Sequence, residues 1–407
     1  MSDKKRIALI TTWFPPQQSV ASNRMHSFAM YLSETYEVEV FCLDEVQINK
    51  KLSDSITVHT STSTTILDKI KEKRSDSSLK HKVKTAIRVI LSKMVNSPLK
   101  KWQELTIKKV KDVHAVNPFD IIISSYAPIE AHLVALEFLK EFSTVLWIAD
   151  MRDEMSKNYY LSTNQKSKLR EFELIIDRHA TAITSVSLPI LKDYQILCPS
   201  VSNFLEVRNG YNHTFKRDLV INKKNSVFTM GYFGTFYGAN KPDNFLIALK
   251  ELKAKKPDFN FEFHMYGVHR NFVIPQEIKE CVKLFPAVNY DQAIQRMMEM
   301  DANVLFDPFS DRKGVFTGKL FDYISVQRPI IACTDTKDVA AEMIVEFDCG
   351  YVAEFSNVND NKEIVLKAFS DWGNEIFKFA NTEHVDSIHR KKQVEKLDKL
   401  IQKLLTT

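Results

Sequence analysis

The stretch FTGKLFDYISVQRPIIA, residues Phe316–Ala332, joins a helical pattern directly to a buried strand. Apolar residues recur at helical spacing from Leu320 onward, and Pro329 ends that pattern and opens the apolar run Ile330–Cys333. A short, continuously apolar strand that follows a helix is typical of parallel sheets covered on both faces. The stretch therefore predicts an α/β fold.

The start of this predicted helix has the chemistry of a phosphate site. Thr317 and Gly318 lead into a first turn that carries Lys319, and Asp322 follows one turn later. Free N–H groups at a helix N-terminus favour anions, and a lysine adds a full positive charge. A carboxylate at Asp322 can accept hydrogen bonds from two adjacent sugar hydroxyls. The motif predicts a site for a nucleotide diphosphate; the alternative is an ordinary αβ unit with a surface lysine and a solvated aspartate.

The same alternation of strands and helices extends over both halves of the chain. Strands are expected over the apolar runs Ile7–Thr12, Val38–Leu43, Asp120–Ser125, Val145–Asp150, Ala182–Val186, Val227–Phe233, Phe261–Tyr266, Asn303–Phe306 and Ile330–Cys333. Helices are expected over Asn23–Glu34, Glu130–Phe142, Ser167–Ala180, Asn244–Lys255, Tyr290–Met300 and Val339–Phe347. This alternation of strands and helices predicts two doubly wound, Rossmann-like domains that face a central cleft.

The predicted domains are 1–205, with a basic helical insertion at about 66–113, and 206–383, because an Asn-Gly turn signal lies just after residue 205. Residues 384–407 are expected to form a charged amphipathic helix that packs back. Ser53–Ser63 is the stretch closest to a flexible segment.

Composition sets the class of protein. The 407 residues are 44% hydrophobic and 26% charged, and the five cysteines lack metal-ligand spacing. The sequence has neither a signal-peptide core nor an apolar run of membrane-spanning length. We expect a cytoplasmic protein that needs no cofactor and no metal.

One segment carries the basic excess of the chain. Fourteen Lys or Arg residues stand against five Asp or Glu residues between Ile66 and Asp112, whereas the whole chain has a net charge of only +5. Within it, Leu79–Val113 shows a cationic helix pattern broken at Pro98, which predicts peripheral contact with an anionic surface such as the inner face of the plasma membrane. The alternative is a solvated, lysine-rich face of a domain helix. Nucleic acid is not expected, because Trp102 is the one aromatic residue nearby.

Three further stretches carry candidate site residues. The glycine-rich loop Gly231–Lys241, which includes Gly234 and Tyr237, follows the first strand of the second half and can bring backbone N–H groups close to a phosphate.

Acidic and basic residues follow a strand of the first half in the run Asp150-Met151-Arg152-Asp153. Either Asp150 or Asp153 can contact an acceptor hydroxyl with Arg152 near phosphate, or the run is a helix cap with a salt bridge. Ser22-Asn23-Arg24 can start a helix while Arg24 reaches a phosphate; the alternative is an N-cap followed by an exposed arginine.

These stretches together resemble a known family. The segments GYFGTFYGANKPDNFLIAL (Gly231–Leu249), MMEMDANVLFDPF, FTGKLFDYISVQRPIIA and EFDCGYV, with ITTWFPPQQSVASNR, SSYAPIEAHLVAL and WIADMRDE in the first half, resemble retaining, GT4-like glycosyltransferases of the GT-B fold, of the bacterial surface-polysaccharide type. The resemblance implies that a nucleotide-diphosphate sugar binds the second domain and a saccharide or lipid-linked acceptor binds the first.

The resemblance also implies roles for single residues. Lys241 and Lys319 correspond to the basic residues that meet the diphosphate, and Asp322 falls on the second glutamate of an E-x7-E pair. The first glutamate of that pair is replaced by Gly314. Two other functions stay open: a nucleotide-sugar epimerase of the same architecture, and a catalytically degenerate scaffold.

Overall fold

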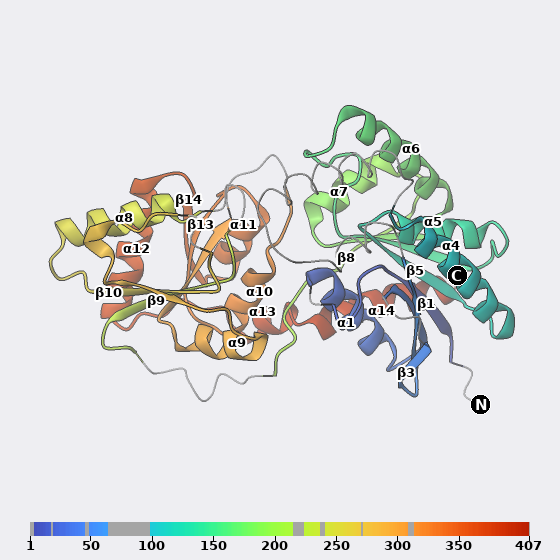
Figure 1. The fold of residues 1–407 in the computed structure, drawn as a ribbon, viewed down its shortest axis with the longest axis horizontal. Helices are drawn as coiled ribbons and strands as arrows, with labels where there is room; N and C mark the ends of the chain where they lie inside the picture. Colours follow the sequence, from blue (N-terminus) through green and yellow to red (C-terminus); the bar gives the residue numbers. More distant parts are fainter. Residues whose placement is uncertain are drawn as a thin grey trace, which may run out of the picture. The chain divides into compact units, whose positions relative to one another are not determined.

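The computed structural model describes residues 4–17, 19–44, 49–63, 98–214, 224–236, 241–269, 272–307 and 313–406. The chain divides into two compact units, 1–207 together with 394–407, and 208–393 (Figure 1). Each unit holds one mainly parallel sheet with helices packed against it, so the prediction of two doubly wound, Rossmann-like domains is confirmed. The units are described one at a time below.

The sheet of the first unit has the strand order β3-β4-β2-β1-β5-β6-β7-β8. All neighbours are parallel except the edge pair β3 and β4. The strands are β1 (Arg6–Ile10), β2 (Glu37–Leu43), β3 (Asn49–Ser53), β4 (Ile56–Ser61), β5 (Ile121–Tyr126), β6 (Leu146–Met151), β7 (Ala182–Ser185) and β8 (Asn203–Glu206). Its helices are α1 (Val20–Leu32), α4 (Lys100–Val116), α5 (Glu130–Leu139), α6 (Thr163–His179) and α7 (Leu188–Leu197). The order reverses between β1 and β5, which makes their carboxyl ends the switch point of this sheet.

The sheet of the second unit is fully parallel, in the order β11-β10-β9-β12-β13-β14. Its strands are β9 (Phe228–Phe233), β10 (Phe261–Tyr266), β11 (Val282–Phe285), β12 (Ala302–Asp307), β13 (Ile330–Thr334) and β14 (Gly350–Glu354). The helices are α8 (Asp243–Lys255), α9 (Tyr290–Glu299), α10 (Gly318–Ser325), α11 (Val339–Glu346), α12 (Val358–Gly373) and α13 (Thr382–Ser387), with a 3-10 turn at Gln276–Ile278. Here the order reverses between β9 and β12.

Strand β4 and helix α1 are among the elements of the first unit for which the expectation needs correction. Ile56–Ser61, inside the stretch that the serines and threonines made look flexible, is strand β4, because Ile56 and Val58 are buried against the core while β2 supplies a parallel partner. Helix α1 begins three residues earlier than expected, at Val20, because the Ser19 side chain caps it by accepting from the Ser22 N–H at 3.0 Å.

The basic segment is described from residue 98 onward. Residues 98–113 fall in and just before helix α4, whose buried residues recur every fourth position: Trp102, Thr106, Val110 and His114. Its lysines lie on the remaining, exposed or half-exposed face, and Lys111 pairs with Glu141 at 2.5 Å. This part of the segment is an ordinary amphipathic domain helix; residues 79–97 lie outside the described part.

The C-terminal region is not one helix. Helix α13 ends at Ser387, and helix α14 (Arg390–Thr406) starts after a break at Ile388 and His389. Val385 and Ile388 are buried in the core of the second unit, whereas Val394, Leu397, Ile401 and Leu404 belong to the core of the first. The apolar face expected over 384–405 is therefore divided between two cores.

Candidate functional site

The second unit gathers polar groups at its switch point. Gly234 directly follows β9, Asp307 ends β12, and these two strands are neighbours on either side of the reversal in strand order. Ligands of doubly wound sheets bind at the carboxyl ends of the strands at such a point. Residue Tyr237 of the glycine-rich loop lies outside the described residues.

Helix α10 brings Lys319 to this place. Its apolar side chains Leu320, Phe321 and Ile324 are buried, and the Phe233 N–H donates to the Tyr323 hydroxyl at 3.2 Å. These contacts anchor the helix to the end of β9. The N-cap residue Thr317 has an extended backbone and its side chain makes no capping hydrogen bond, so the first N–H groups of α10 are not satisfied by a side-chain cap.

Lys319 lies in a cradle built by strand β9. Its Nζ donates to the Tyr232 hydroxyl at 3.0 Å and lies 4.6 Å from the centroid of the Tyr232 ring. Gly234 has φ +121°, and a Cβ atom there would lie 2.7 Å from the Lys319 Cε. A side chain at this turn would strain the backbone and push the end of the lysine side chain aside.

Burial shifts the pKa values of Lys319 and of the neighbouring Asp307. Burial lowers the pKa of Lys319 to about 8, opposed by the carboxylate of Asp307. The pKa of Asp307 is raised to about 6, chiefly by burial and further by Asp338, while Lys319 opposes the rise. A lysine and an aspartate whose pKa values move toward neutrality in one place are typical of a functional site.

Asp322 lies in a different environment one turn along α10. The Tyr290 hydroxyl, at the start of α9, donates to the Asp322 Oδ1 at 2.7 Å. Burial raises the pKa of Asp322 to about 6, opposed by the hydrogen bond from Tyr290 and by the charge of Arg390. Lys241 is half-buried and precedes Pro242, the N-cap residue of α8. The structure thus brings Gly234 and Lys319 together and gives Asp322 a separate partner.

Gly314 has a conformational reason to be glycine. It is buried with φ +82°, and its N–H donates at 2.8 Å to the Asp338 carboxylate, which also caps α11 through the Val339 N–H at 2.8 Å. The residues of this site that sequence reasoning missed are Tyr232, Asp307 and Asp338. Asp307 could have been found, because it directly ends a buried strand; nothing in the sequence says that the Tyr232 hydroxyl meets a lysine 87 residues away.

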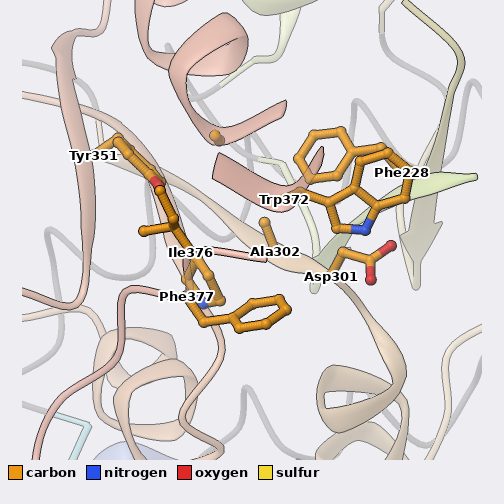
Figure 2. Close-up of a pocket in the computed structure, with 9 residues that line it drawn as sticks. Phe228, Asp301, Ala302, Tyr351, Trp372, Ile376 and Phe377 are labelled. Carbon is orange, nitrogen blue, oxygen red and sulfur yellow. The ribbon is translucent and has the colours of Figure 1, made fainter. Parts of the chain in front are cut away.

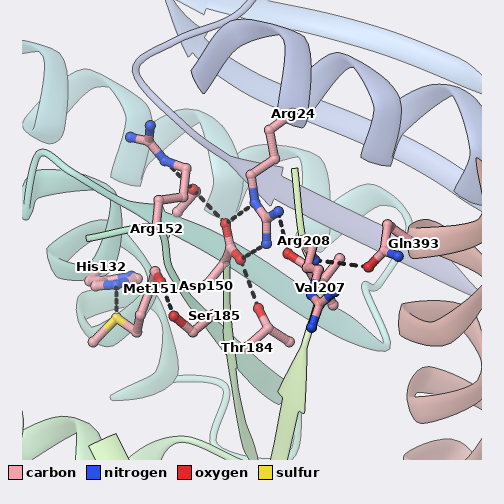
Figure 3. Close-up of polar contacts among 11 residues, drawn as sticks. Arg24, His132, Asp150, Met151, Arg152, Thr184, Ser185, Val207, Arg208 and Gln393 are labelled. Atoms are coloured by element: carbon pink, nitrogen blue, oxygen red, sulfur yellow. Dashed lines mark hydrogen bonds and ion pairs between the residues drawn. The ribbon is translucent and has the colours of Figure 1, made fainter. Parts of the chain in front are cut away.

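In the first unit, Arg24 and Asp150 form a buried ion pair (Figure 3). The Arg24 Nε and Nη2 donate to the two carboxylate oxygens at 3.1 and 2.6 Å, and its Nη1 donates to the Val207 carbonyl at 2.6 Å. Asp150 also accepts from the hydroxyls of Ser125 and Thr184, both at 2.8 Å. Burial alone would raise the pKa of Asp150, but the charge of Arg24 and these hydrogen bonds outweigh it and lower that pKa.

This geometry corrects the roles expected for both residues. Asp150 is 0% exposed and Arg24 is 3% exposed, so neither offers a free group to a phosphate or an acceptor hydroxyl. The pair ties α1 and β6 to the end of β8. Ser22 is also fully buried and Asn23 is exposed on α1, so the run Ser22-Asn23-Arg24 does not present one common surface.

Arg152 and Asp153 remain near the strand ends of the first unit. The Arg152 Nε donates to the Ser125 hydroxyl at 3.1 Å, and its Nη2 donates to the Ala127 carbonyl, which ties the loop after β6 to the loop after β5. The Asp153 carbonyl accepts from the Tyr194 hydroxyl at 3.0 Å, and its side chain is half-exposed. Of the two carboxylates expected near an acceptor hydroxyl, that of Asp150 is buried and that of Asp153 is half-exposed.

A separate small hollow, open to solvent, lies at the opposite end of the second sheet (Figure 2). It is lined by Phe228, Ala302 and Pro329, which begin or precede β9, β12 and β13, together with Trp372 and Tyr351. Because it opens at the amino ends of the strands, it is not part of the Lys319 site.

Within the described ranges, no three or more His, Cys, Asp or Glu side chains are arranged to hold a metal ion. None of the helices in that part of the chain combines the length and the apolar composition needed to cross a bilayer.

Comparison with known proteins supports the architecture. No protein-family model matches the sequence, and no curated protein matches it either. Among solved structures, sucrose-phosphate synthase from Thermosynechococcus elongatus is similar over 99% of this chain and 100% of its own, with a TM-score of 0.64 at 12% identity. The lipopolysaccharide outer core galactosyltransferase WaaB is similar over 98% of this chain and 99% of its own, at TM-score 0.62 and 13% identity.

A trehalose-6-phosphate protein from E. coli, solved with UDP-2-fluoroglucose, covers 99% of both chains at TM-score 0.63 and 10% identity. Each of these similarities extends over nearly the whole of both chains. The chain has the GT-B fold. At such low sequence identities, the similarity of this chain to these structures establishes the fold alone. The activity has to be argued from the site.

Proposed function

We propose that this protein is a glycosyltransferase that moves a sugar from a nucleotide-diphosphate donor to an acceptor hydroxyl. The observation that carries the proposal is the Lys319 ammonium, held by Tyr232 and Gly234 at the switch point of the second sheet. A half-buried cation at this point suits a diphosphate. The similar E. coli protein was solved with a UDP-sugar analogue, which favours the same ligand class here.

The chemistry asked of the donor site is mainly electrostatic. Bond cleavage leaves new negative charge on the departing diphosphate, and preorganised cations and N–H groups stabilise such charge where it develops. Lys319 and the first turn of α10 supply these groups, with Lys241 as a second cation. Asp322 is proposed as the ribose contact, as the resemblance implies. In this proposal the two lysines take the place of a metal, and the sugar is transferred with retention.

The acceptor is proposed to be a surface polysaccharide or a lipid-linked saccharide that binds the first domain. Asp153 and Arg152 are the candidate contacts there, because Asp150 is committed to Arg24. Leu79–Val113 is proposed to hold the protein peripherally on the cytoplasmic face of the membrane. Its lysines are expected to contribute about 1 kcal/mol each near an anionic surface before screening.

Binding of UDP, GDP and ADP, measured by titration calorimetry between pH 7 and pH 9.5, tests the donor site. Lys319 is charged below its pKa of about 8, so affinity is expected to fall as the pH rises through 8. Lys319→Met should remove about 1.5–3 kcal/mol, roughly 10- to 150-fold in affinity, and with it the pH dependence in this window.

Lys255→Met, at the exposed end of α8, is the matched control and should leave both affinity and pH profile unchanged. If no nucleotide binds, or if Lys319→Met binds as tightly as the wild type, the proposed donor site is wrong.

One observation favours a second candidate, a nucleotide-sugar epimerase. A candidate UDP-N-acetylglucosamine 2-epimerase from Listeria monocytogenes is similar over 98% of this chain, at a lower TM-score of 0.53 and 9% identity. An epimerase converts the nucleotide sugar without any acceptor. Product analysis by NMR in the absence of acceptor separates the two, because a transferase leaves the sugar configuration of the donor unchanged.

A further inference from the structure

We propose that Tyr232 is a positioning residue, whose hydroxyl and ring determine where the Lys319 ammonium lies at the donor site. The inference rests on the proposed function, in which Lys319 meets the diphosphate. Neither the composition nor the family resemblance assigns any role to this tyrosine.

Tyr232 is itself rigidly held. It is 0% exposed, its ring stacks on Phe236 at 4.4 Å with an interplanar angle of 8°, and it packs against Phe306 at 5.3 Å. A buried ring between two aromatic neighbours has no room to change rotamer. The hydroxyl oxygen is therefore a fixed point at the end of β9.

The direction of the hydrogen bonds makes this oxygen an acceptor toward the lysine. The Tyr232 hydroxyl donates its one proton to the Thr235 carbonyl at 3.3 Å, which leaves the oxygen lone pairs for the Lys319 Nζ at 3.0 Å. The ring face also attracts the ammonium, 4.6 Å from its centroid. Both interactions favour one location of the charge.

A neutral acceptor suits a cation that must bind a phosphate. Among the residues that the structure describes, Asp307 of β12 is a charged group that acts on Lys319, and Asp307 is itself influenced by Asp338 of the α11 N-cap. A carboxylate as the main partner would neutralise the ammonium, whereas the phenol orients it and leaves its charge for the ligand. The missing Cβ of Gly234 then allows the lysine stem to pass the turn.

A double-mutant cycle on nucleotide binding tests the proposal. Tyr232→Phe keeps the ring and removes the acceptor; we expect UDP, GDP or ADP affinity to fall about 5- to 20-fold, by the loss of one hydrogen bond to a charged group. In the Lys319→Met background the same change should alter affinity less than 2-fold, because Tyr232 acts through Lys319. An equal loss in both backgrounds would mean a general structural role and overturn the proposal.

Tyr351→Phe is the control for loss of a half-buried phenol hydroxyl in the same unit, since its hydroxyl bonds Asp371 at 2.6 Å, away from Lys319. It should bind nucleotides like the wild type. Gly234→Ala provides a second test that leaves the aromatic ring intact. The added methyl group displaces the Lys319 side chain and should lower nucleotide affinity. In the Lys319→Met background the same change should have no further effect on affinity.

A ligand-free measurement separates this proposal from the proposed function. The pH dependence with which an amine-modifying reagent labels Lys319, followed by mass spectrometry, reports the state of the ammonium without any nucleotide. Removing the acceptor of the charged form should move the labelling curve of Tyr232→Phe to lower pH. If the wild type binds no nucleotide but the labelling curve of Tyr232→Phe is shifted, the donor site is refuted and the Tyr232–Lys319 link is kept. If the curve of Tyr232→Phe equals that of the wild type, the link is refuted.

Discussion

Asp150 and Arg24 put two full charges into the interior of the first domain. Taking both groups out of water is costly, and the pair is tolerated because each carboxylate oxygen and each guanidinium nitrogen that is described has a close polar partner. The sequence showed an acidic residue after a strand and an arginine on the first loop, which is the pattern of a cleft-facing site. Their 126-residue separation hid the fact that they neutralise each other.

Asp150→Asn should therefore lower the free energy of unfolding of the first domain by about 3–5 kcal/mol at pH 7, because Arg24 stays buried without its counter-charge. The folded-state pKa of Asp150 is lowered, so its contribution is present above the ordinary value and disappears as the pH falls through the lowered pKa. The gap between variant and wild type should narrow from pH 5 toward pH 2.

Denaturant unfolding followed by tryptophan fluorescence measures this, since the buried Trp102 and Trp147 both belong to the first unit. The exposed Asp112→Asn is the control. A constant gap at all pH values would contradict the ion-pair account.

The role of Gly314 is decided by its backbone conformation. A side chain at φ +82° is strained, at a cost of about 1–3 kcal/mol, and a new carboxylate would face Asp338, which holds the Gly314 N–H. Gly314→Glu, which restores the family carboxylate, should thus lower the melting temperature by several degrees and should not raise donor turnover. Gly373→Glu, with open space around it in α12, is the comparison variant; a stable Gly314→Glu protein with higher turnover would disprove this reading.

At the scale of elements, the apolar pattern predicted the bounds of some helices, whereas packing decided where the C-terminal helix breaks. The periodicity predicted α8, α9 and α11 to within about a residue at each described end. It predicted a single C-terminal helix, because spacing shows an apolar face but not which core that face meets. Likewise β4 has a polar composition and becomes a strand through its pairing with β2.

Helix α14 is expected to be a structural part of the first domain. Leu397 is 0% exposed in the core that includes β1 and β2, so Leu397→Ala should destabilise this domain by about 2–5 kcal/mol. Lys399→Ala, on the exposed side of the same helix, should be nearly neutral. Thermal unfolding followed by tryptophan fluorescence measures both; equal effects would mean that α14 is not docked through its apolar face.

For the whole molecule, each sheet offers a switch point, and the two carry different chemistry. The second sheet holds a lysine cradled by a tyrosine and a glycine, which suits a diphosphate. In the first sheet the half-exposed Asp153 follows β6, one strand away from the switch point, beside a loop tied by Arg152. This difference between the two sheets supports the proposed assignment of donor and acceptor to different domains.

The proposed membrane association concerns the whole protein and is tested as such. Changing Lys80, Lys82 and Lys84 to glutamine should weaken sedimentation with vesicles that contain anionic lipid, and rising salt should weaken wild-type binding in the same way, because the attraction is electrostatic. Lys255 and Lys256, exposed near the end of α8, provide a control pair when changed to glutamine. Binding that ignores both salt and anionic lipid would refute a membrane role for Leu79–Val113.

The sequence by itself determined the class of fold, the presence of two Rossmann-like domains and the presence of Lys319 and Asp322 on one helix, because strand length, apolar runs and turn residues are local signals. The tertiary structure alone decided that Arg24 and Asp150 pair, that Tyr232 and Gly234 cradle Lys319, and that one C-terminal segment serves two cores. Those outcomes depend on contacts between residues far apart in the chain, and no local pattern encodes which distant partner a buried charge or an apolar face will meet.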